Sequence, residues 1–96
     1  MSLNVVAHIT ARPETVDAVR AILTGFIEPT RQEAGCISYQ LFLNNADPAD
    51  FTFFEEWTSD AALDAHLQTP HLTSGSAQLA PLVAAPPDIR RYSRIA

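Results

Sequence analysis

Ninety-six residues suit one domain, and the whole chain, residues 1–96, is expected to form it. A hydrophobic content of 47% with 18% charged residues is typical of a folded globular protein rather than a disordered one. Eleven acidic against six basic residues give a net charge of −5, and lysine is absent. Nucleic acid is therefore not expected as a partner, because phosphate binding relies on clustered Lys and Arg.

The sequence also indicates where the protein works. Cys36 is the only cysteine, so no intrachain disulfide can form and a reducing compartment is expected. No apolar run approaches the ~20 residues needed to span a bilayer. The first residues, MSLNVVAH, lack the basic region and cleavage site of a signal peptide. We therefore expect a cytoplasmic protein that has no membrane partner.

The first third of the chain predicts a strand followed by a long helix. Residues 3–11 are rich in β-branched side chains that alternate between two faces, as in a strand. A helix is expected over residues 13–35, because Pro13 suits a first helical position and apolar residues recur there at helical spacing. Pro29 lies inside this span and should kink the helix near Gly25 or split it into two pieces.

The middle of the chain predicts a hairpin and two helical pieces. Residues 36–45 and 51–58 alternate as strands on either side of the polar turn NNADPAD. Ser59 is a good N-cap for a short helix that ends at Thr69. A proline follows Thr69 directly, which repeats the start signal and predicts a second helical piece over residues 70–82.

A final strand, over residues 88–96, completes the order β-α-β-β-α-β. This order is that of the ferredoxin-like α+β fold, a four-stranded antiparallel sheet with both helices on one face. Several strands are apolar on both sides, as between Phe51 and Trp57, so the second face should be covered. The simplest cover is a second copy of the chain, and we expect a homodimer joined through its sheet faces.

The stretch HLQTPH raises the question of a metal site. His66 and His71 are five positions apart, which on one helix places them roughly 140° apart around the axis. Paired zinc ligands on a helix instead stand four positions apart. The Thr-Pro break could rescue the geometry, but no third or fourth ligand is apparent in the sequence. We therefore expect that the protein binds no metal.

Motifs for other kinds of catalysis are missing. Cys36 is interpreted as a small buried side chain, because nothing nearby indicates the lowered pKa of a reactive thiolate. The sequence contains no GxSxG, no GxGxxG and no phosphate-binding loop. Any redox chemistry would have to proceed without a tightly bound dinucleotide, and no cofactor is expected.

Two adjacent glutamates stand beside the only tryptophan. Neighbouring side chains on a strand face opposite ways, so either Glu55 or Glu56 should point into the helix-covered interior. A carboxylate held there has a raised pKa or a dedicated hydrogen-bond partner, and is either a candidate base or a buried structural group. Trp57 and Tyr39 are interpreted as core aromatics or as substrate contacts.

The two histidines have two interpretations each. His66 falls three residues after Leu63 and lies on or beside the apolar stripe of its helix. His71 stands in the first turn of the next helical piece, where the helix dipole favours the neutral imidazole. A neutral ring at a pocket rim can accept a proton from a phenol. The alternative is that each ring ties the helix junction to nearby backbone, and spacing alone does not decide between them.

Three stretches resemble a known family. VVAHITARPE, EPTRQEAGCISYQLFLNNADPADFTFFEEW and LDAHLQTPH are similar to the small quinol-monooxygenase-like members of the antibiotic biosynthesis monooxygenase superfamily. The resemblance runs from about Val5 to Ile95 and rests on the patterns E-x-G-C-x-x-Y, F-x-F-x-E-x-W and H-x-x-x-x-H. It implies a ferredoxin-like protomer whose sheet packs on its twin as a dimeric α+β barrel, with a pocket between sheet and helices.

The resemblance also implies an activity. Characterised relatives oxidise quinols, anthrones or similar hydroxylated aromatics with O2, without metal, haem or flavin. Such chemistry needs a protein that deprotonates, orients and desolvates its substrate. Carried over by position, the expected site residues are His66 and His71 at a helical lid, Trp57 and Tyr39 as pocket walls, and Asn44 and Glu55 as further polar contacts. The lead hypothesis takes either His66 or His71 as the proton acceptor.

Two other functions stay open. One branch of the superfamily isomerises a phosphorylated, sugar-derived signalling molecule, for which the few arginines would be the only cationic contacts. A non-catalytic dimer that binds a small aromatic ligand is the third hypothesis. The resemblance disfavours haem degradation: the relatives that perform it use an Asn on the first strand and a Trp and a His in the second helical region, where this chain has VVAH and AHLQTPHLTSGS and no Trp after Trp57.

Overall fold

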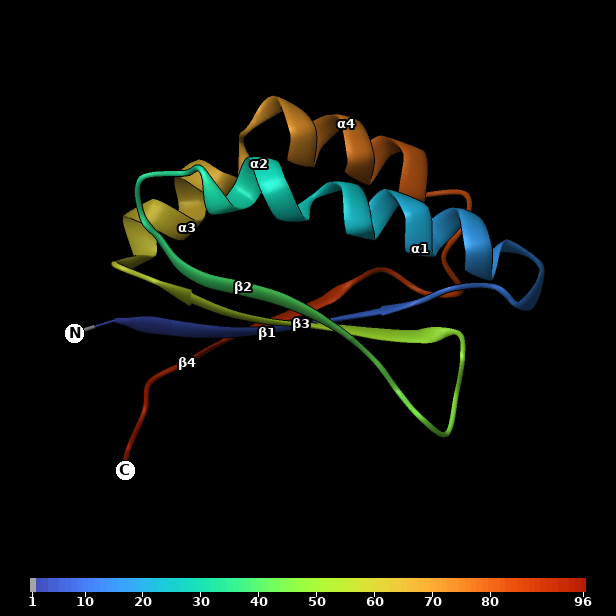
Figure 1. The fold of residues 1–96 in the computed structure, drawn as a ribbon, viewed down its shortest axis with the longest axis horizontal. Helices are drawn as coiled ribbons and strands as arrows, with labels where there is room; N and C mark the ends of the chain where they lie inside the picture. Colours follow the sequence, from blue (N-terminus) through green and yellow to red (C-terminus); the bar gives the residue numbers. More distant parts are fainter. Residues whose placement is uncertain (1) are drawn as a thin grey trace.

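The computed structural model of the protein describes residues 2–96, and its helices lie against one face of a single sheet (Figure 1). The strands, in chain order, are β1 (Leu3–Thr10), β2 (Cys36–Leu43), β3 (Asp50–Trp57) and β4 (Asp88–Tyr92). They stand in the order β2-β3-β1-β4, and each neighbouring pair is antiparallel. This is the ferredoxin-like βαββαβ arrangement, so the predicted α+β fold is confirmed.

Pro29 splits the first helical region. The helical segments, in chain order, are η1 (Pro13–Thr15), α1 (Val16–Gly25), α2 (Ile27–Arg31), α3 (Asp60–Leu67) and α4 (Pro70–Leu79). Pro29 has no N–H to donate to the carbonyl of Gly25, four residues earlier, and the helix is interrupted there. Of the two predicted outcomes, a kink or a split, the structure has the split. No helix within residues 2–96 combines the length and apolarity needed to cross a membrane.

Two elements end earlier than the sequence predicts. The prediction carried the last helix to residue 82, but α4 ends at Leu79, because Pro81 cannot donate a hydrogen bond to the carbonyl four residues before it. The last strand was expected to reach residue 96, but β4 ends at Tyr92. Tyr92 pairs with Asn4, and β1 begins at Leu3. Residues after Tyr92 therefore have almost no partner strand left to pair with.

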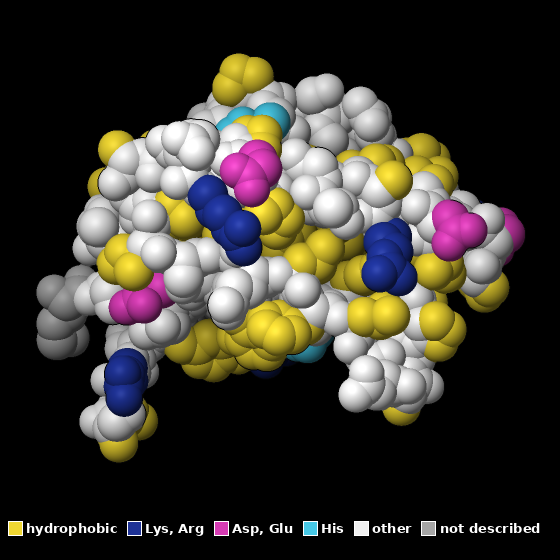
Figure 2. Space-filling model, viewed as in Figure 1, with side chains coloured by type: hydrophobic (Ala, Val, Ile, Leu, Met, Phe, Trp, Pro, Cys, Tyr) yellow, Lys and Arg dark blue, Asp and Glu magenta, His cyan; other side chains and the backbone are white. Residues whose placement is uncertain are grey.

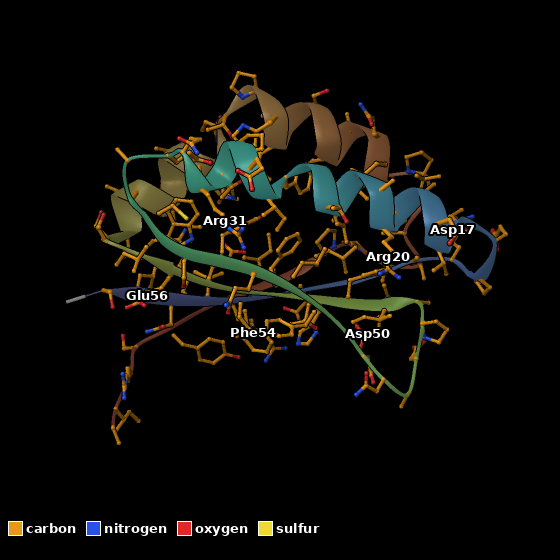
Figure 3. All side chains as sticks on the ribbon, in the orientation of Figure 1. Asp17, Arg20, Arg31, Asp50, Phe54 and Glu56 are labelled. Atoms are coloured by element: carbon orange, nitrogen blue, oxygen red, sulfur yellow. The ribbon has the colours of Figure 1, made fainter. Side chains whose placement is uncertain are left out.

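Side-chain alternation gives the sheet one buried and one open face. On the helix-covered face, β1 and β3 bury every second residue, namely Leu3, Val5, Ala7, Ile9, Phe51, Phe53, Glu55 and Trp57. Phe54 points away from the helices (Figure 3) and is 46% exposed. Hydrophobic side chains gather along the underside of the molecule in Figure 2. On the open face of the sheet, the rings of Phe42 and Phe54 meet edge to face with their centroids 5.2 Å apart. Glu55 is therefore the inward glutamate of the adjacent pair.

Two glycines allow the helices to approach closely. A Cβ at Gly35, just before β2, would collide with the Cβ of Ala62 in α3. A Cβ at Gly75 in α4 would collide with the ring of Phe26, between α1 and α2. The contact at Gly35 brings the chain that leads into β2 against α3, and with it Glu33.

Candidate functional site

A cavity of about 60 Å³ lies between the sheet and the helices, in the layer where side chains from both meet in Figure 3. Its wall is apolar except for three side chains: Glu55 from β3, His66 from α3 and Ser76 from α4. None of the described residues that line it is an arginine. A carboxyl group and an imidazole in the wall of one apolar cavity are typical of proton-transfer sites.

His66 is held in one tautomer by Glu33. Its Nδ1 lies 2.7 Å from Oε2 of Glu33, and because a carboxylate only accepts, the imidazole donates Nδ1–H. Burial, partly offset by Glu33, lowers the pKa of His66 and favours the neutral ring. Nε2 then carries a lone pair and makes no hydrogen bond with residues 2–96. Since no fully buried side-chain nitrogen in that range lacks a partner, Nε2 is not fully buried, and His66 is among the residues that line the cavity.

His71 joins the same carboxylate oxygen from the other side. Its Nε2 lies 3.1 Å from Oε2 of Glu33 and 3.2 Å from the hydroxyl oxygen of Thr30. The hydroxyl oxygen of Thr69 is also near, at 3.4 Å. His71 does not line the cavity, and 24% of its side chain is exposed on the outer side of the helices. The structure therefore gives the two histidines different positions, His66 at the cavity and His71 outside it.

The helix break at Thr69 brings the two imidazoles together. Thr69 ends α3 by donating both its hydroxyl and its backbone N–H to the carbonyl of His66, at 2.7 and 3.1 Å. Pro70 then begins α4 in a new direction, as the sequence predicts. The ring centroids of His66 and His71 are 6.1 Å apart, although residues five positions apart on one continuous helix face different ways.

Glu55 is the second titratable group of the cavity. Burial raises its pKa to about 7; the hydrogen bond from Trp57 opposes this shift, and the nearby charge of Glu33 adds to it. The indole Nε1–H of Trp57 donates to Oε1 of Glu55 at 2.9 Å. That contact leaves Oε2 of Glu55 without a protein partner in the described residues. Near neutral pH this oxygen can either donate or accept a hydrogen bond.

The two predicted pocket aromatics lie behind the cavity rather than in its wall. Trp57 and Tyr39 are 0% and 2% exposed, and neither lines the cavity. They pack on His66 instead, with ring centroids 4.6 Å and 5.5 Å from the imidazole. Burial raises the pKa of Tyr39, which keeps its phenol neutral. Trp57 and Tyr39, expected as pocket walls, thus lie beside His66 and not among the residues that line this cavity.

Asn44 lies apart from this cluster. It stands in the turn between β2 and β3, where its side chain is exposed. Its amide nitrogen donates to Asp50 at 3.0 Å, and its side-chain oxygen accepts from the backbone N–H of Ala46 at 2.8 Å. The structure gives Asn44 the role of shaping the hairpin turn, since Asn and Asp commonly bond the backbone two residues on.

Glu33 is the residue that the sequence reasoning missed. It is the first letter of the pattern E-x-G-C-x-x-Y, so the signal was present, but no role was assigned to it. Glu33 lies after the end of α2, and 33 residues separate it from His66. Only the close approach of Gly35 to α3 makes them neighbours, and that contact is not visible in the local sequence pattern.

A second hollow adjoins the cavity. It measures about 380 Å³ and is lined by the end of α4 and by the segment 83–87 that leads into β4. The two spaces share Ser76, Leu79 and Pro87 as lining residues. The two spaces therefore adjoin at this end, between α4 and β4, where Ser76 and Pro87 are exposed.

The sequence of the chain matches a known family over most of its length. The family description Antibiotic biosynthesis monooxygenase fits residues 2–78. The chain belongs to this family. Members of the antibiotic biosynthesis monooxygenase family share the ferredoxin-like fold seen here. The structure of Rv0793 from Mycobacterium tuberculosis aligns with a TM-score of 0.94 at 32% identity, covering 100% of this chain and 97% of that one.

Curated relatives carry monooxygenase names. Rv0793, called a putative monooxygenase, is 40% identical over 82 residues, which are 85% of this chain and 80% of the relative. YgiN of Escherichia coli K12, called a probable quinol monooxygenase, is 36% identical over 77% of this chain and 81% of its own length. An uncharacterized Synechocystis protein, sll1783, is 38% identical over 92% of this chain, which spans only 60% of that relative. A monooxygenase-like function follows from this membership.

Proposed function

We propose that the protein oxidises a quinol, an anthrone or a related hydroxylated aromatic with O2, using no cofactor. The observation that carries this proposal is the free Nε2 of His66 beside an apolar cavity, with Nδ1 fixed by Glu33. A base of this kind removes a proton from a phenol or from an activated CH2 group. The names of YgiN and Rv0793 support the same reaction class.

The reaction needs the protein mainly for its first step. His66 Nε2 takes the proton, and the charge of Glu33 stabilises the imidazolium that results. The electron-rich anion passes one electron to O2, and the two radicals combine to a peroxide anion on the ring carbon. This anion takes the proton back from the His66 imidazolium and becomes a hydroperoxide. Loss of water then leaves a carbonyl, so that CH2 and O2 become C=O and H2O. One oxygen atom enters the product and the other leaves as water.

The cavity wall favours this chemistry in two ways. Its apolar side chains exclude water, which strengthens each remaining polar contact and protects reactive intermediates. Glu55, with its pKa of about 7, can donate a hydrogen bond to a carbonyl or phenolate oxygen of the substrate. Trp57 and Tyr39 act as positioning residues, because they hold Glu55 and His66 from behind.

An aromatic substrate needs more space than this cavity alone provides. The cavity of about 60 Å³ is smaller than the engineered cavity of roughly 150 Å³ that accommodates benzene. The adjoining hollow of about 380 Å³, which shares Ser76, Leu79 and Pro87 with the cavity, offers the missing space. We propose that an aromatic substrate enters there, between α4 and β4, and fills both spaces.

Oxygen uptake tests the proposal. Purified protein freed of metal by chelation should consume O2 faster than buffer when supplied with a reduced naphthoquinol or an anthrone. Mass spectrometry with 18O2 should find one labelled oxygen in the product, as the balance above requires. No rate above buffer across a panel of quinols and anthrones would contradict the proposal.

The isomerase alternative has little support at this site. A phosphorylated substrate needs cationic contacts, and no arginine lines the cavity. A non-catalytic binder of aromatic ligands would use the same apolar wall, but it would need neither the fixed tautomer of His66 nor its free Nε2. If an aromatic ligand binds and the oxygen assay fails, the binder becomes the better description.

The open face of the sheet supports a homodimer. Its exposed apolar side chains include Phe42 (48%), Phe54 (46%) and Tyr92 (46%), and an exposed apolar surface on a sheet favours a partner of the same shape. We propose that two copies join through these faces. A cytoplasmic location stays a prediction that rests on the single unpaired cysteine.

A further inference from the structure

We infer that Glu33, His66 and His71 form a binding site for a divalent first-row transition metal such as Zn2+. The three side chains come from separate segments: the turn after α2, the last turn of α3 and the first turn of α4. One carboxylate oxygen and one imidazole nitrogen from each histidine lie within 4.8 Å of one another. None of the three residues is fully exposed.

The ligand set suits such a metal. Zn2+ and its neighbours in the first transition row prefer imidazole nitrogen and carboxylate oxygen, and two histidines with one carboxylate are a recurrent set. Three protein ligands leave at least one coordination position open. The cluster is thus typical of an exchangeable or functional metal site rather than of a closed structural one.

The distances are close to those that a metal requires. Two ligands of a tetrahedral Zn2+ stand about 3.3 Å apart, given metal–ligand distances of roughly 2.0–2.1 Å. Glu33 Oε2 is 2.7 Å from His66 Nδ1 and 3.1 Å from His71 Nε2, so both separations need to widen only slightly. The widest of the three separations between ligand atoms, up to 4.8 Å, has to shorten by about 1.5 Å. His71 can supply that movement, because its side chain is only partly buried.

The fold changes both features of the sequence that disfavour a metal. Five-residue spacing disfavours a shared ligand sphere on one continuous helix, but the chain breaks at Thr69 and the two rings converge. A third ligand was not apparent in the sequence, but Glu33 supplies it from 33 residues away. The exposed side of His71 also gives an ion a path to the cluster.

Metal binding and proton abstraction exclude each other at His66. A neutral imidazole that binds a metal through Nδ1 must carry its proton on Nε2. The proton therefore moves from Nδ1 to Nε2, and no proton is released overall. Nε2 then has no lone pair to take a proton from a substrate, so the bound metal would inhibit the enzyme. This consequence rests on the proposed function, whereas metal binding itself does not.

Binding can be measured without any substrate. Metal-free protein is titrated with Zn2+ in competition with a chromophoric chelator, and with Co2+ while its visible absorption is followed. We expect one equivalent per chain. His71→Ala should weaken binding at least tenfold, and so should Glu33→Gln, which keeps the shape of the side chain. His8→Ala removes an exposed imidazole on the other face of the sheet and should bind as the native protein does.

Several results would overturn the inference. The inference is wrong if the native protein does not compete with the chelator for Zn2+. It is also wrong if His71→Ala binds the ion as tightly as the native protein, or if His8→Ala loses the ion. Cys36→Ser serves as a further control, because a thiol near the cluster is another ligand for Zn2+; loss of binding in this variant would also contradict the site. Circular dichroism shows whether each variant is folded. Failure of the oxygen assay leaves all of these outcomes unaffected.

Discussion

At the scale of single residues, the site depends on a contrast between two carboxyl groups. Glu33 is partly exposed and accepts hydrogen bonds from two imidazoles, whereas Glu55 is 8% exposed and accepts one bond from an indole. Burial therefore raises the pKa of Glu55 to about 7. Glu33 thus supplies a negative charge that orients His66, and Glu55 supplies a neutral hydrogen-bond donor near physiological pH.

Glu55 should make the protein less stable as the pH rises. Its pKa is about 7 in the folded state and near the ordinary value of 4.5 in the unfolded chain, so the folded state holds this proton longer. The stability it contributes is fully present below pH 4.5 and is lost as the pH passes 7. Glu55→Gln removes this pH dependence. The unfolding free energy of the variant minus that of the native protein should therefore rise by about 2 kcal/mol between pH 5 and pH 8.

Urea unfolding of both proteins at the two pH values measures this gain. All other titrating groups are common to both proteins and cancel in the comparison. A difference in unfolding free energy that stays constant between pH 5 and pH 8 would show that Glu55 is ionised in the folded protein.

At the scale of elements, the sequence predicts the pieces better than their contacts. Alternation in the strands, the split at Pro29 and the new helix start at Pro70 are local effects, and all three are found in the structure. The element ends at Leu79 and Tyr92 were missed because they depend on Pro81 and on the length of a partner strand. The pairing of Glu33 with His66 depends on how β2 approaches α3, which no local pattern encodes.

Two glycine substitutions test the close contact between α3 and the chain that leads into β2. Gly35→Ala places a methyl group against Ala62 and should destabilise the protein by about 1–3 kcal/mol, as overpacking does. Gly25→Ala is the matched control, because no atom lies within 4 Å of the added Cβ, and it should be neutral or stabilising by up to about 1 kcal/mol. Chemical denaturation gives both values. Equal effects of the two substitutions would mean that β2 and α3 are not in close contact.

At the scale of the whole molecule, the two faces of the sheet have separate tasks. The face under the helices lies against the cavity, and its residues alternate with those of the open face along β1 and β3. The fold class and the need for a cover on the open face could both be predicted from this alternation. The lining of the cavity could not, because Phe53, Glu55 and Trp57 share the inner face of β3 but only Phe53 and Glu55 line the cavity.

A charge on the open face should separate the proposed dimer. Phe54→Lys places an ammonium group among apolar side chains in the dimer but leaves the protomer core untouched, since Phe54 is 46% exposed. Gln78→Lys adds the same charge on the helical layer and serves as the control. Light scattering at micromolar concentration should find dimers for the native protein and for Gln78→Lys, and monomers for Phe54→Lys. A native monomer would contradict the dimer.

The whole account depends on His66 as the group that takes the proton. The most direct measurement compares the turnover number for oxygen uptake in His66→Gln with that in His8→Gln, both metal-free and supplied with the same quinol. His66→Gln should lower it about a hundredfold or more, because a positioned general base contributes on that order. His8→Gln, on the opposite face of the sheet, should leave it unchanged. Native turnover in His66→Gln would contradict the account.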